Sequence, residues 1–306
     1  MTALLLFALV VAGGAGYVSW AKHCIAHGAS LWWFVVGAPV AYLSPVVLLV
    51  ALWFLLSWIW RTPRPAAARL DAAGCARLFV REVLAVASSW PLIILHRVLL
   101  RDPAPAPCAR PVILVHGVLV NDGVWFGFRR HLVRKGIGGA YTVNYGPPYA
   151  DIEHYAEQLA AKVDAVCAAT GAQRVALVGH SMGGLVSRAY VRRFGAARVE
   201  RIITIGTPHH GSVLAWTYPG RSLVQMRPGN AWLVELNRDE GKPSVPMVSI
   251  WSRHDSMVAP QASSELAGAD NVALTGIGHN ALLGDQGLID FVARELSKAP
   301  VPKNPG

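Results

Sequence analysis

The segment Gly-His-Ser-Met-Gly at residues 179–183 has the form G-x-S-x-G, and it joins a short apolar run to a helix-like pattern. A serine on such a sharp turn adopts strained backbone angles, so its neighbours must be small, and Gly179 and Gly183 meet that need. The turn would present the Ser181 hydroxyl at the carboxyl end of a sheet, beside a helix N-terminus that favours negative charge. The pattern predicts a nucleophilic serine; the alternative is a glycine-rich turn with an incidental serine.

A serine hydroxyl is a weak nucleophile until a base takes its proton. Where the serine lies between a strand and a helix of this kind, an acid and then a histidine follow it in chain order. His279, in "GIGHNALL", follows a late strand, and Asp255, in "SRHDSMVAP", follows the strand before it. We therefore expect a triad of Ser181, Asp255 and His279. Asp270 is the less favoured acid, because it precedes the last strand instead of following the fifth.

The same reaction needs hydrogen-bond donors for the developing oxyanion. We expect the backbone N–H groups of Met182, directly after the serine, and of Val118, in the loop "HGVLVNDGVW" after the first strand. His116 ends that strand and is expected to hold the loop in shape. His209 and His210 precede the acid and are not assigned as the base. A metal shared between them and the acid is conceivable, but the spacing does not require one.

Short β-branched runs alternate with helix-length segments from Pro111 onward, which predicts a mostly parallel sheet flanked by helices. Strands are expected over residues 112–116, 139–145, 174–179, 199–206, 245–252 and 271–278, and helices over 151–171, 184–195 and 287–298. The longest insertion, around residues 212–245, is interpreted as a small cap lining an acyl pocket, or as a surface loop with a packed helix.

The first sixty residues carry a single formal charge, at Lys22, in a chain that is 53% apolar and only 15% charged. Residues 2–20 and 31–60 are long and apolar enough to cross a bilayer, with a polar turn expected over residues 22–30. Tryptophans near the ends of the second stretch are typical of membrane interfaces. The alternative for the first stretch is a cleaved signal peptide, but only Met1 and Thr2 precede the apolar run, which leaves no basic n-region. The prediction is a multi-pass membrane protein with two spans.

Positive charge follows the second apolar stretch, with arginines at positions 61, 64, 69, 77 and 81. By the positive-inside bias, the catalytic part would be cytoplasmic. The formal net charge is +10, but no Lys/Arg-rich run with interleaved aromatic residues is present. The basic balance therefore favours anionic lipid headgroups over nucleic acid as a partner, or simply solubility.

Three parts are expected: residues 1–60 as two transmembrane helices, 61–110 as a joining region, and 111–306 as the catalytic domain. Within the joining region, residues 75–100 are interpreted as an amphipathic helix at the membrane interface or as a helix packed on the catalytic domain. Residues 101–111 are rich in proline and are interpreted as a linker.

The four cysteines are far apart in the sequence and form no C-x-x-C pair, so a zinc site is not expected.

Taken together, "PVILVHG", "VGHSMGGLVSRAY", "TIGTPHHGS", "SRHDSMVAP" and "GIGHNALL" resemble, in this order, the α/β-hydrolase superfamily, and within it bacterial lipases and esterases. The two apolar stretches resemble membrane-anchored relatives. The resemblance implies an α/β-hydrolase fold over residues 111–298, a triad on Ser181, Asp255 and His279, and an oxyanion hole at Val118 and Met182. It implies hydrolysis of carboxylic esters of lipids or other hydrophobic substrates, with no organic cofactor; a structural calcium ion is not excluded.

Two other functions fit the same sequence. An acyltransferase or a thioesterase would use the same triad, because a fold does not choose between them. A non-catalytic, lipase-like membrane protein is the third interpretation, against which the complete triad and oxyanion loop argue. Acyl-chain length, head group and oligomeric state are not indicated by the sequence.

Overall fold

The computed structural model describes residues 2–299, and its centre is a sheet of six strands. All neighbouring strands are parallel, in the order β2-β1-β3-β4-β5-β6. The strands are β1 (Val112–Val115), β2 (Ala140–Val143), β3 (Val175–His180), β4 (Val199–Ile205), β5 (Met247–Ser252) and β6 (Asp270–Leu274). The predicted parallel sheet is confirmed, with each strand shorter than or shifted slightly from its expected range.

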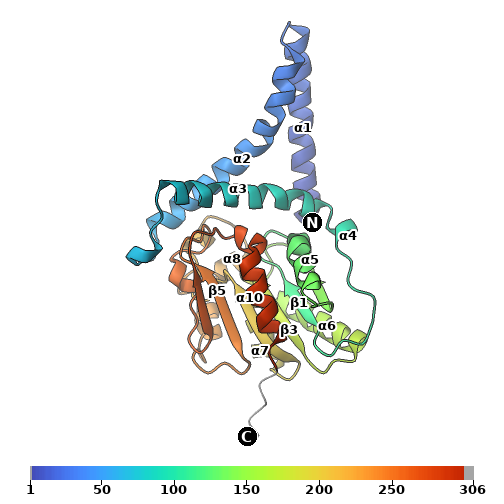
Figure 1. Cartoon of the computed structure of the whole chain (residues 1–306), viewed down its shortest axis with the longest axis vertical. Helices are drawn as coiled ribbons and strands as arrows, with labels where there is room; N and C mark the ends of the chain where they lie inside the picture. The colour runs from blue at the N-terminus through green and yellow to red at the C-terminus, as the bar shows by residue number, and fades with distance from the viewer. Residues whose placement is uncertain (1, 300–306) are drawn as a thin grey trace.

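Helices cover both faces of this sheet (Figure 1). Ile113 of β1 packs into the apolar cluster formed with α6 and α7, and its neighbour Leu114 packs into the cluster on the other face, with α5 and α10. This alternation is the period-2 pattern of a strand buried on both sides. The four helices are α5 (Phe126–Arg134), α6 (Ile152–Thr170), α7 (Met182–Phe194) and α10 (Gln286–Ser297). Helix α5 has no counterpart among the predicted elements.

Two long apolar helices, α1 (Thr2–Ala26) and α2 (Leu31–Ile59), form a hairpin that projects from the part of the chain that carries the sheet, the expected catalytic domain (Figure 1). Both are long and apolar enough to cross a membrane. The expected polar turn at residues 22–30 is shorter than predicted. Helix α1 continues past Lys22 to Ala26, and Gly28, with a φ of 92°, makes the turn to α2.

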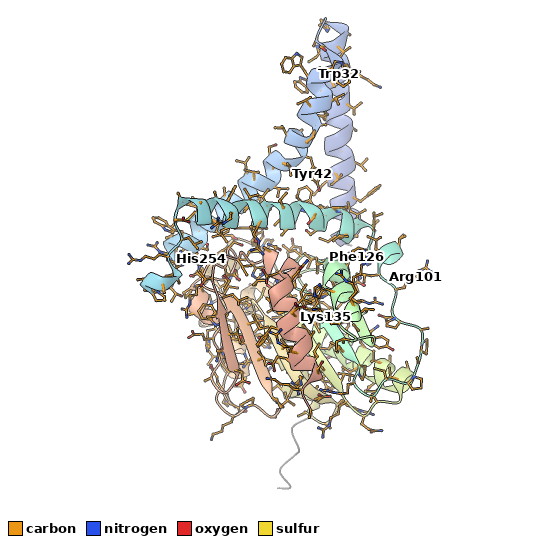
Figure 2. All side chains as sticks on the ribbon, viewed as in Figure 1. Trp32, Tyr42, Arg101, Phe126, Lys135 and His254 are labelled. Carbon is orange, nitrogen blue, oxygen red and sulfur yellow. The ribbon has the colours of Figure 1, made fainter. Side chains whose placement is uncertain are left out.

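The surface of this hairpin is apolar, with tryptophans at both ends. Trp32 and Trp33 lie exposed at the far tip, where Figure 2 labels Trp32, and Trp58 and Trp60 lie exposed at the end nearest the catalytic part. Leucine, valine and phenylalanine side chains between them point outward along both helices (Figure 2). A soluble protein rarely leaves so large a patch uncovered, and this arrangement is typical of a membrane-facing surface with aromatic belts.

Helix α3 (Ala72–Ile94) lies across the catalytic part, between it and the hairpin (Figure 1). An apolar cluster joins Trp53 of α2 and Val83 of α3 to Leu214, which comes from the insertion between β4 and β5. Helix α3 packs against the part of the chain that carries the sheet, while Val80 and Leu84 of α3 remain exposed on its other side. Residues 101–111 form no helix or strand, as expected of a linker.

The insertion between β4 and β5 contains only short helices, as a small cap would. The remaining short elements of the described chain are α4 (His96–Leu99), α8 (Arg221–Gln225), α9 (Ala231–Leu236) and the 3-10 turns η1 (Ala66–Ala68), η2 (Asp122–Trp125), η3 (Val213–Trp216), η4 (Gln261–Ser264) and η5 (Ala281–Gly284). The indole N–H of Trp53 in α2 donates to the hydroxyl of Tyr218, 2.8 Å away in this insertion. The cap is therefore attached to the second apolar helix.

Candidate active site

Ser181 occupies the turn between β3 and α7 in a strained conformation, with φ 55° and ψ −126°. Its N–H donates to the carbonyl of Ile205 (2.8 Å), and its carbonyl accepts from Thr207 Oγ1 (2.8 Å). A Cβ atom on Gly179 would lie 2.5 Å from the backbone nitrogen of Gly184, and one on Gly183 would overlap the carbonyl oxygen of Val115. The need for small neighbours is confirmed, and the surrounding strands hold the strained turn in place.

Asp255 and His279 lie in the loops that follow β5 and β6, at the same edge of the sheet as Ser181. His279 Nδ1 is 2.9 Å from Asp255 Oδ2, and both side chains are buried. The other oxygen, Asp255 Oδ1, accepts the backbone N–H groups of Met257 (2.8 Å) and Val258 (2.7 Å). The carboxylate is thereby fixed in position, and the Nδ1–H of His279 is directed at it. The rival acid, Asp270, is exposed at the start of β6, the opposite edge.

His279 differs from the neighbouring His180 in the direction in which its pKa is shifted. Burial alone lowers its pKa, but the Asp255 carboxylate, through its charge and its hydrogen bond, and the charge of Glu82 outweigh burial. The pKa of His279 is therefore raised above its usual value of 6.5. General-base catalysis requires a histidine whose pKa lies near the operating pH, so that the ring is neutral before the reaction and accepts a proton readily during it.

The ring of His279 also lies close to the serine turn. Its centroid is 4.7 Å from that of His180, the residue before Ser181, and His180 Nε2 donates to the His279 carbonyl at 3.2 Å. Burial and the neighbouring His279 lower the pKa of His180 far below 6.5, so this ring stays neutral. The structure thus gathers the three predicted triad residues at one edge of the sheet.

The loop after β1 approaches the serine closely. A Cβ atom on Gly117 would lie 3.0 Å from Ser181 Cβ, so a side chain there would crowd the nucleophile. Within residues 2–299, the backbone N–H groups of Val118 and Met182 donate to no backbone or side-chain acceptor. Two unpaired N–H groups, one directly after the serine and one in the loop that approaches it, are what an oxyanion hole needs.

His116 keeps this loop in shape, as predicted. Its Nδ1 lies 2.8 Å from the carbonyl of Gly117, and its ring stacks on Tyr145 with centroids 4.0 Å apart. The Tyr145 hydroxyl in turn donates to the His116 carbonyl. Burial lowers the pKa of His116 to about 4, so the ring is neutral, and its one N–H donates a hydrogen bond to the carbonyl of Gly117.

A cavity of about 410 Å³ opens over Ser181. Its wall includes Val118 of the loop after β1, Trp90 of α3, and Leu214 and Met226 of the cap. Within the described chain, the three residues other than glycine with positive φ are Leu119 (60°), Tyr149 (69°) and Ser181 (55°), and all three line this cavity. Strained backbone conformations of this kind cluster at functional sites, where the surrounding structure holds them in place. Residues of the insertion between β4 and β5 therefore form part of the wall of this cavity.

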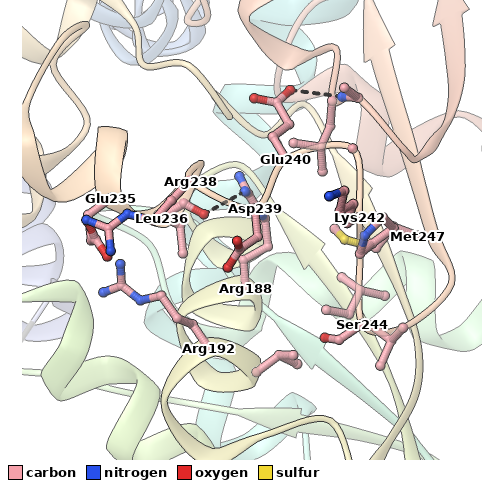
Figure 3. A pocket seen from close by; sticks show the side chains of 17 residues that line it. Arg188, Arg192, Glu235, Leu236, Arg238, Asp239, Glu240, Lys242, Ser244 and Met247 are labelled. Carbon is pink, nitrogen blue, oxygen red and sulfur yellow. Dashed lines mark hydrogen bonds and ion pairs between the residues drawn. The ribbon is translucent and has the colours of Figure 1, made fainter. Parts of the chain in front are cut away.

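A second cavity, of about 450 Å³, has several charged side chains in its wall and lies beside α7 and α9 (Figure 3). Its labelled side chains include Arg188, Arg192, Glu235 and Arg238. Arg188 donates to the carbonyl of Leu236 (3.1 Å), so its guanidinium is already paired. None of the predicted site residues lines this cavity, and the cavity over Ser181 is the candidate active site.

His209 and His210 do not join the acid. His209 is buried between Thr204 Oγ1 (3.1 Å) and Arg188 (3.2 Å), where burial and then Arg188 lower its pKa far below 6.5. His210 pairs with Glu240 at 2.9 Å. Among the described residues, no group of three or more His, Cys, Asp or Glu side chains is arranged to hold a metal ion.

Glu82 of α3 is a site residue that the sequence analysis missed. It is fully buried. Its Oε1 accepts from Ser256 Oγ (2.7 Å) and from the backbone and side-chain nitrogens of Asn280 (3.0 and 2.9 Å), and its Oε2 accepts from the N–H of Ala281 (3.0 Å). One carboxylate therefore joins the residue after Asp255 to the two residues after His279. The sequence does indicate a special role for Glu82. It is a charged residue, yet it lies four residues from both Leu78 and Val86 and therefore on the buried face of helix α3.

Known proteins resemble this chain in sequence and in fold. The sequence model described as the alpha/beta hydrolase fold matches residues 110–261. Triacylglycerol lipases of Pseudarthrobacter phenanthrenivorans and Burkholderia plantarii are each 42% identical over 113 residues, which is 34% of this chain and 35% and 31% of theirs. The chain thus spans about a third of the length of these curated relatives.

A solved structure extends the likeness in fold. The mature form of a Bacillus licheniformis lipase superposes with a TM-score of 0.55 at 20% identity, over 65% of this chain and 96% of that one. Three observations point to the same fold. They are the parallel sheet with helices on both faces, the serine turn after β3, and the match to the sequence model. The chain therefore has the α/β-hydrolase fold over the part that carries the sheet, and in sequence it is similar to triacylglycerol lipases.

Proposed function

We propose that the chain is a membrane-anchored serine hydrolase that cleaves carboxylic esters of lipids or of other hydrophobic molecules. The observation that carries the proposal is Ser181, on a strained turn at the wall of an apolar cavity, beside a buried His279 hydrogen-bonded to Asp255. The likeness to triacylglycerol lipases supports the same reaction class.

In the proposed reaction, the Ser181 hydroxyl attacks the ester carbonyl while His279 Nε2 takes its proton. Asp255 holds the ring by Nδ1 and stabilises the imidazolium that forms. His279 then gives the proton to the leaving alcohol, which leaves an acyl-enzyme on Ser181. Water, activated by the same histidine, attacks the acyl group and releases a carboxylic acid.

The oxyanion formed in both steps would be stabilised by the N–H groups of Val118 and Met182. Their lack of partners among the described residues supports this role, because donors that are already in position need no reorganisation when the charge develops. The N-terminus of α7 adds a favourable dipole at the same point.

The anchor would hold the site at a bilayer. Two apolar helices with exposed leucines and terminal tryptophans support residues 1–60 as the anchor, with 61–110 as the joining region and 111–306 as the catalytic domain. The arginines that follow Trp60 support a cytoplasmic catalytic domain. A reporter enzyme fused after Gly306 tests this side: activity only of a cytoplasmic reporter supports it, and activity of a periplasmic reporter contradicts it.

Hydrolysis is tested with an ester series of increasing acyl length on purified full-length protein. We expect turnover by the wild type and background rates for Ser181→Ala, whose fold is checked by thermal unfolding. Flat background activity of the wild type across the series would contradict the proposal. Repeating the assay with an added alcohol or thiol acceptor separates hydrolysis from acyl transfer, because only transfer yields a new ester, and a thioester series does the same for thioesterase activity.

A further inference from the structure

The cavity over Ser181 is not enclosed by the catalytic domain alone. Leu5, Leu6 and Leu9 of α1 line it, as do Leu49 and Trp53 of α2. Residues of α3 and of the cap complete the wall. The two apolar helices therefore form part of the space next to the nucleophile, in addition to any anchoring role.

The wall from α1 is open to the outside. Leu5 and Leu9 line the cavity yet are 62% and 63% exposed. Because these two leucines are part of the cavity wall and are also exposed, the cavity opens to the outside beside them. This opening is called the mouth of the cavity below. Because α1 and α2 are the proposed membrane spans, this mouth would face the hydrocarbon of the bilayer and not water.

The mouth lies at the depth of one leaflet. Leu9 is seven residues from the start of α1, about 10 Å along its axis, and Leu49 is ten residues from the end of α2, about 15 Å. These helix ends are the ones nearest the catalytic domain (Figure 1). Half of the hydrocarbon thickness of a bilayer is also about 15 Å. The opening would thus lie within the leaflet next to the catalytic domain.

The lining suits a hydrocarbon chain. Every described residue that lines the cavity is uncharged. Several of its polar groups are already paired: Ser212 Oγ donates to the Met257 carbonyl (2.7 Å), Tyr218 accepts from Trp53 (2.8 Å), and the Asn280 amide donates to Glu82 (2.9 Å). The pairing of Trp53 with Tyr218 also fixes the wall of α2 against the cap.

We propose that the substrate is an ester lipid resident in the bilayer, and that it enters sideways between α1, α2 and α3 from the adjacent leaflet. Its acyl chain lies along Leu9, Leu49 and Trp53 while the ester carbonyl reaches Ser181. The inference rests on the proposed function, since it needs Ser181 to be the nucleophile. It assigns the anchor a second role, as part of the acyl-binding site.

A cross-linking experiment tests the path of the chain directly. Full-length protein in phosphatidylcholine vesicles is treated with a long-chain alkyl fluorophosphonate that carries a diazirine near the end of its chain. The phosphonate bonds to Ser181 with loss of fluoride, and irradiation joins the chain end to its neighbours. Tryptic cleavage after Lys22 and Arg61 then gives separate peptides for α1 and α2.

We expect cross-links in the peptides of α1 or α2. Cross-links confined to residues 111–299, on protein labelled at Ser181, would overturn the inference and leave the proposed function intact. Absence of any label at Ser181 would instead contradict the proposed function, and the inference with it.

Matched substitutions provide a second test. Leu9→Trp and Leu49→Trp place bulk at the mouth, whereas Leu4→Trp and Leu48→Trp, at residues 72% and 70% exposed that do not line the cavity, are the controls. The readout is the ratio of kcat/KM for a long-chain ester dissolved in the vesicles to that for a water-soluble acetate ester. We expect the ratio to fall about tenfold in the two mouth variants and to stay at the wild-type value in the controls. Equal ratios in all four variants would overturn the inference.

Discussion

Replacing Glu82 by glutamine tests whether a residue outside the matched hydrolase region positions the proposed triad. The amide oxygen of glutamine can still accept the three hydrogen bonds made to Oε1, from Ser256 and Asn280. The amide NH2 would replace Oε2, however, and would face the N–H of Ala281, which now donates to Oε2 at 3.0 Å. One buried backbone donor would lose its partner, two residues after His279.

The size of the effect follows from these contacts. An unpaired buried N–H costs about 1–3 kcal/mol, and each bond to a charged acceptor that becomes neutral loses about 1 kcal/mol more. With three such bonds, we expect Glu82→Gln to lower the free energy of unfolding by about 4–6 kcal/mol. The loop of residues 279–281 would shift to relieve the clash and misplace the imidazole. A transition-state loss of about 1–3 kcal/mol corresponds to a fall in kcat of about 5- to 160-fold. KM should change little, since Glu82 does not line the cavity.

The pH profile separates positioning from simple stability. The charge of Glu82 is one of the causes that raise the pKa of His279, so its removal lowers that pKa. The base must be neutral to accept a proton, and the acid limb of kcat/KM should therefore move to lower pH in Glu82→Gln. Glu82→Asp, which keeps the charge, should keep the limb closer to that of the wild type. The exposed Glu265→Gln is the control for a lost charge elsewhere.

The assay measures kcat, KM and the pH profile on a water-soluble ester, with thermal unfolding in detergent measured in parallel. A lower melting temperature with kcat and the acid limb of the pH profile unchanged would contradict a positioning role, because Glu82 would then stabilise the fold without acting on His279.

Other consequences can be checked with the same protein. Asp255→Asn should lower kcat by about 10³–10⁴-fold in steady-state assays, because the ring of His279 loses the acceptor that sets its tautomer; a loss below tenfold would speak against this acid. In the wild type, kcat/KM should fall as the pH drops through a midpoint above 6.5, since the pKa of His279 is raised; a midpoint below 6.5 would contradict the paired, buried imidazole. Gly183→Ala should destabilise the protein by more than about 2 kcal/mol in thermal unfolding, because its Cβ overlaps the carbonyl of Val115, whereas Gly127→Ala, with open space around it, should not.

The hydrolase fold and the meeting of Ser181, Asp255 and His279 were predictable from the sequence, because local patterns determine them. Short buried strands have clear apolar runs, and the glycines around Ser181 mark a turn that other residues cannot adopt without a clash. Because the sheet is parallel, the carboxyl ends of its strands all lie at one edge, and residues that follow different strands meet there.

Two features depend on tertiary contacts that no local pattern encodes. Helix α5 was missed because its polar and basic residues obscure the apolar face formed by Phe128 and Leu132. The use of α1 and α2 as walls of the cavity follows from their packing on α3 and the cap, through contacts such as the bond between Trp53 and Tyr218. Hydropathy alone identifies these helices as apolar and gives no sign of what they enclose.

If Ser181 is the nucleophile, it forms a covalent intermediate with the help of His279. The most direct measurement is mass spectrometry of the full-length protein after reaction with a fluorophosphonate, followed by peptide mapping. We predict a single phosphonyl adduct on the tryptic peptide that contains Ser181, at a rate greatly reduced in His279→Ala and with no adduct in Ser181→Ala. An unmodified wild-type protein, or an adduct on another residue, would contradict the account.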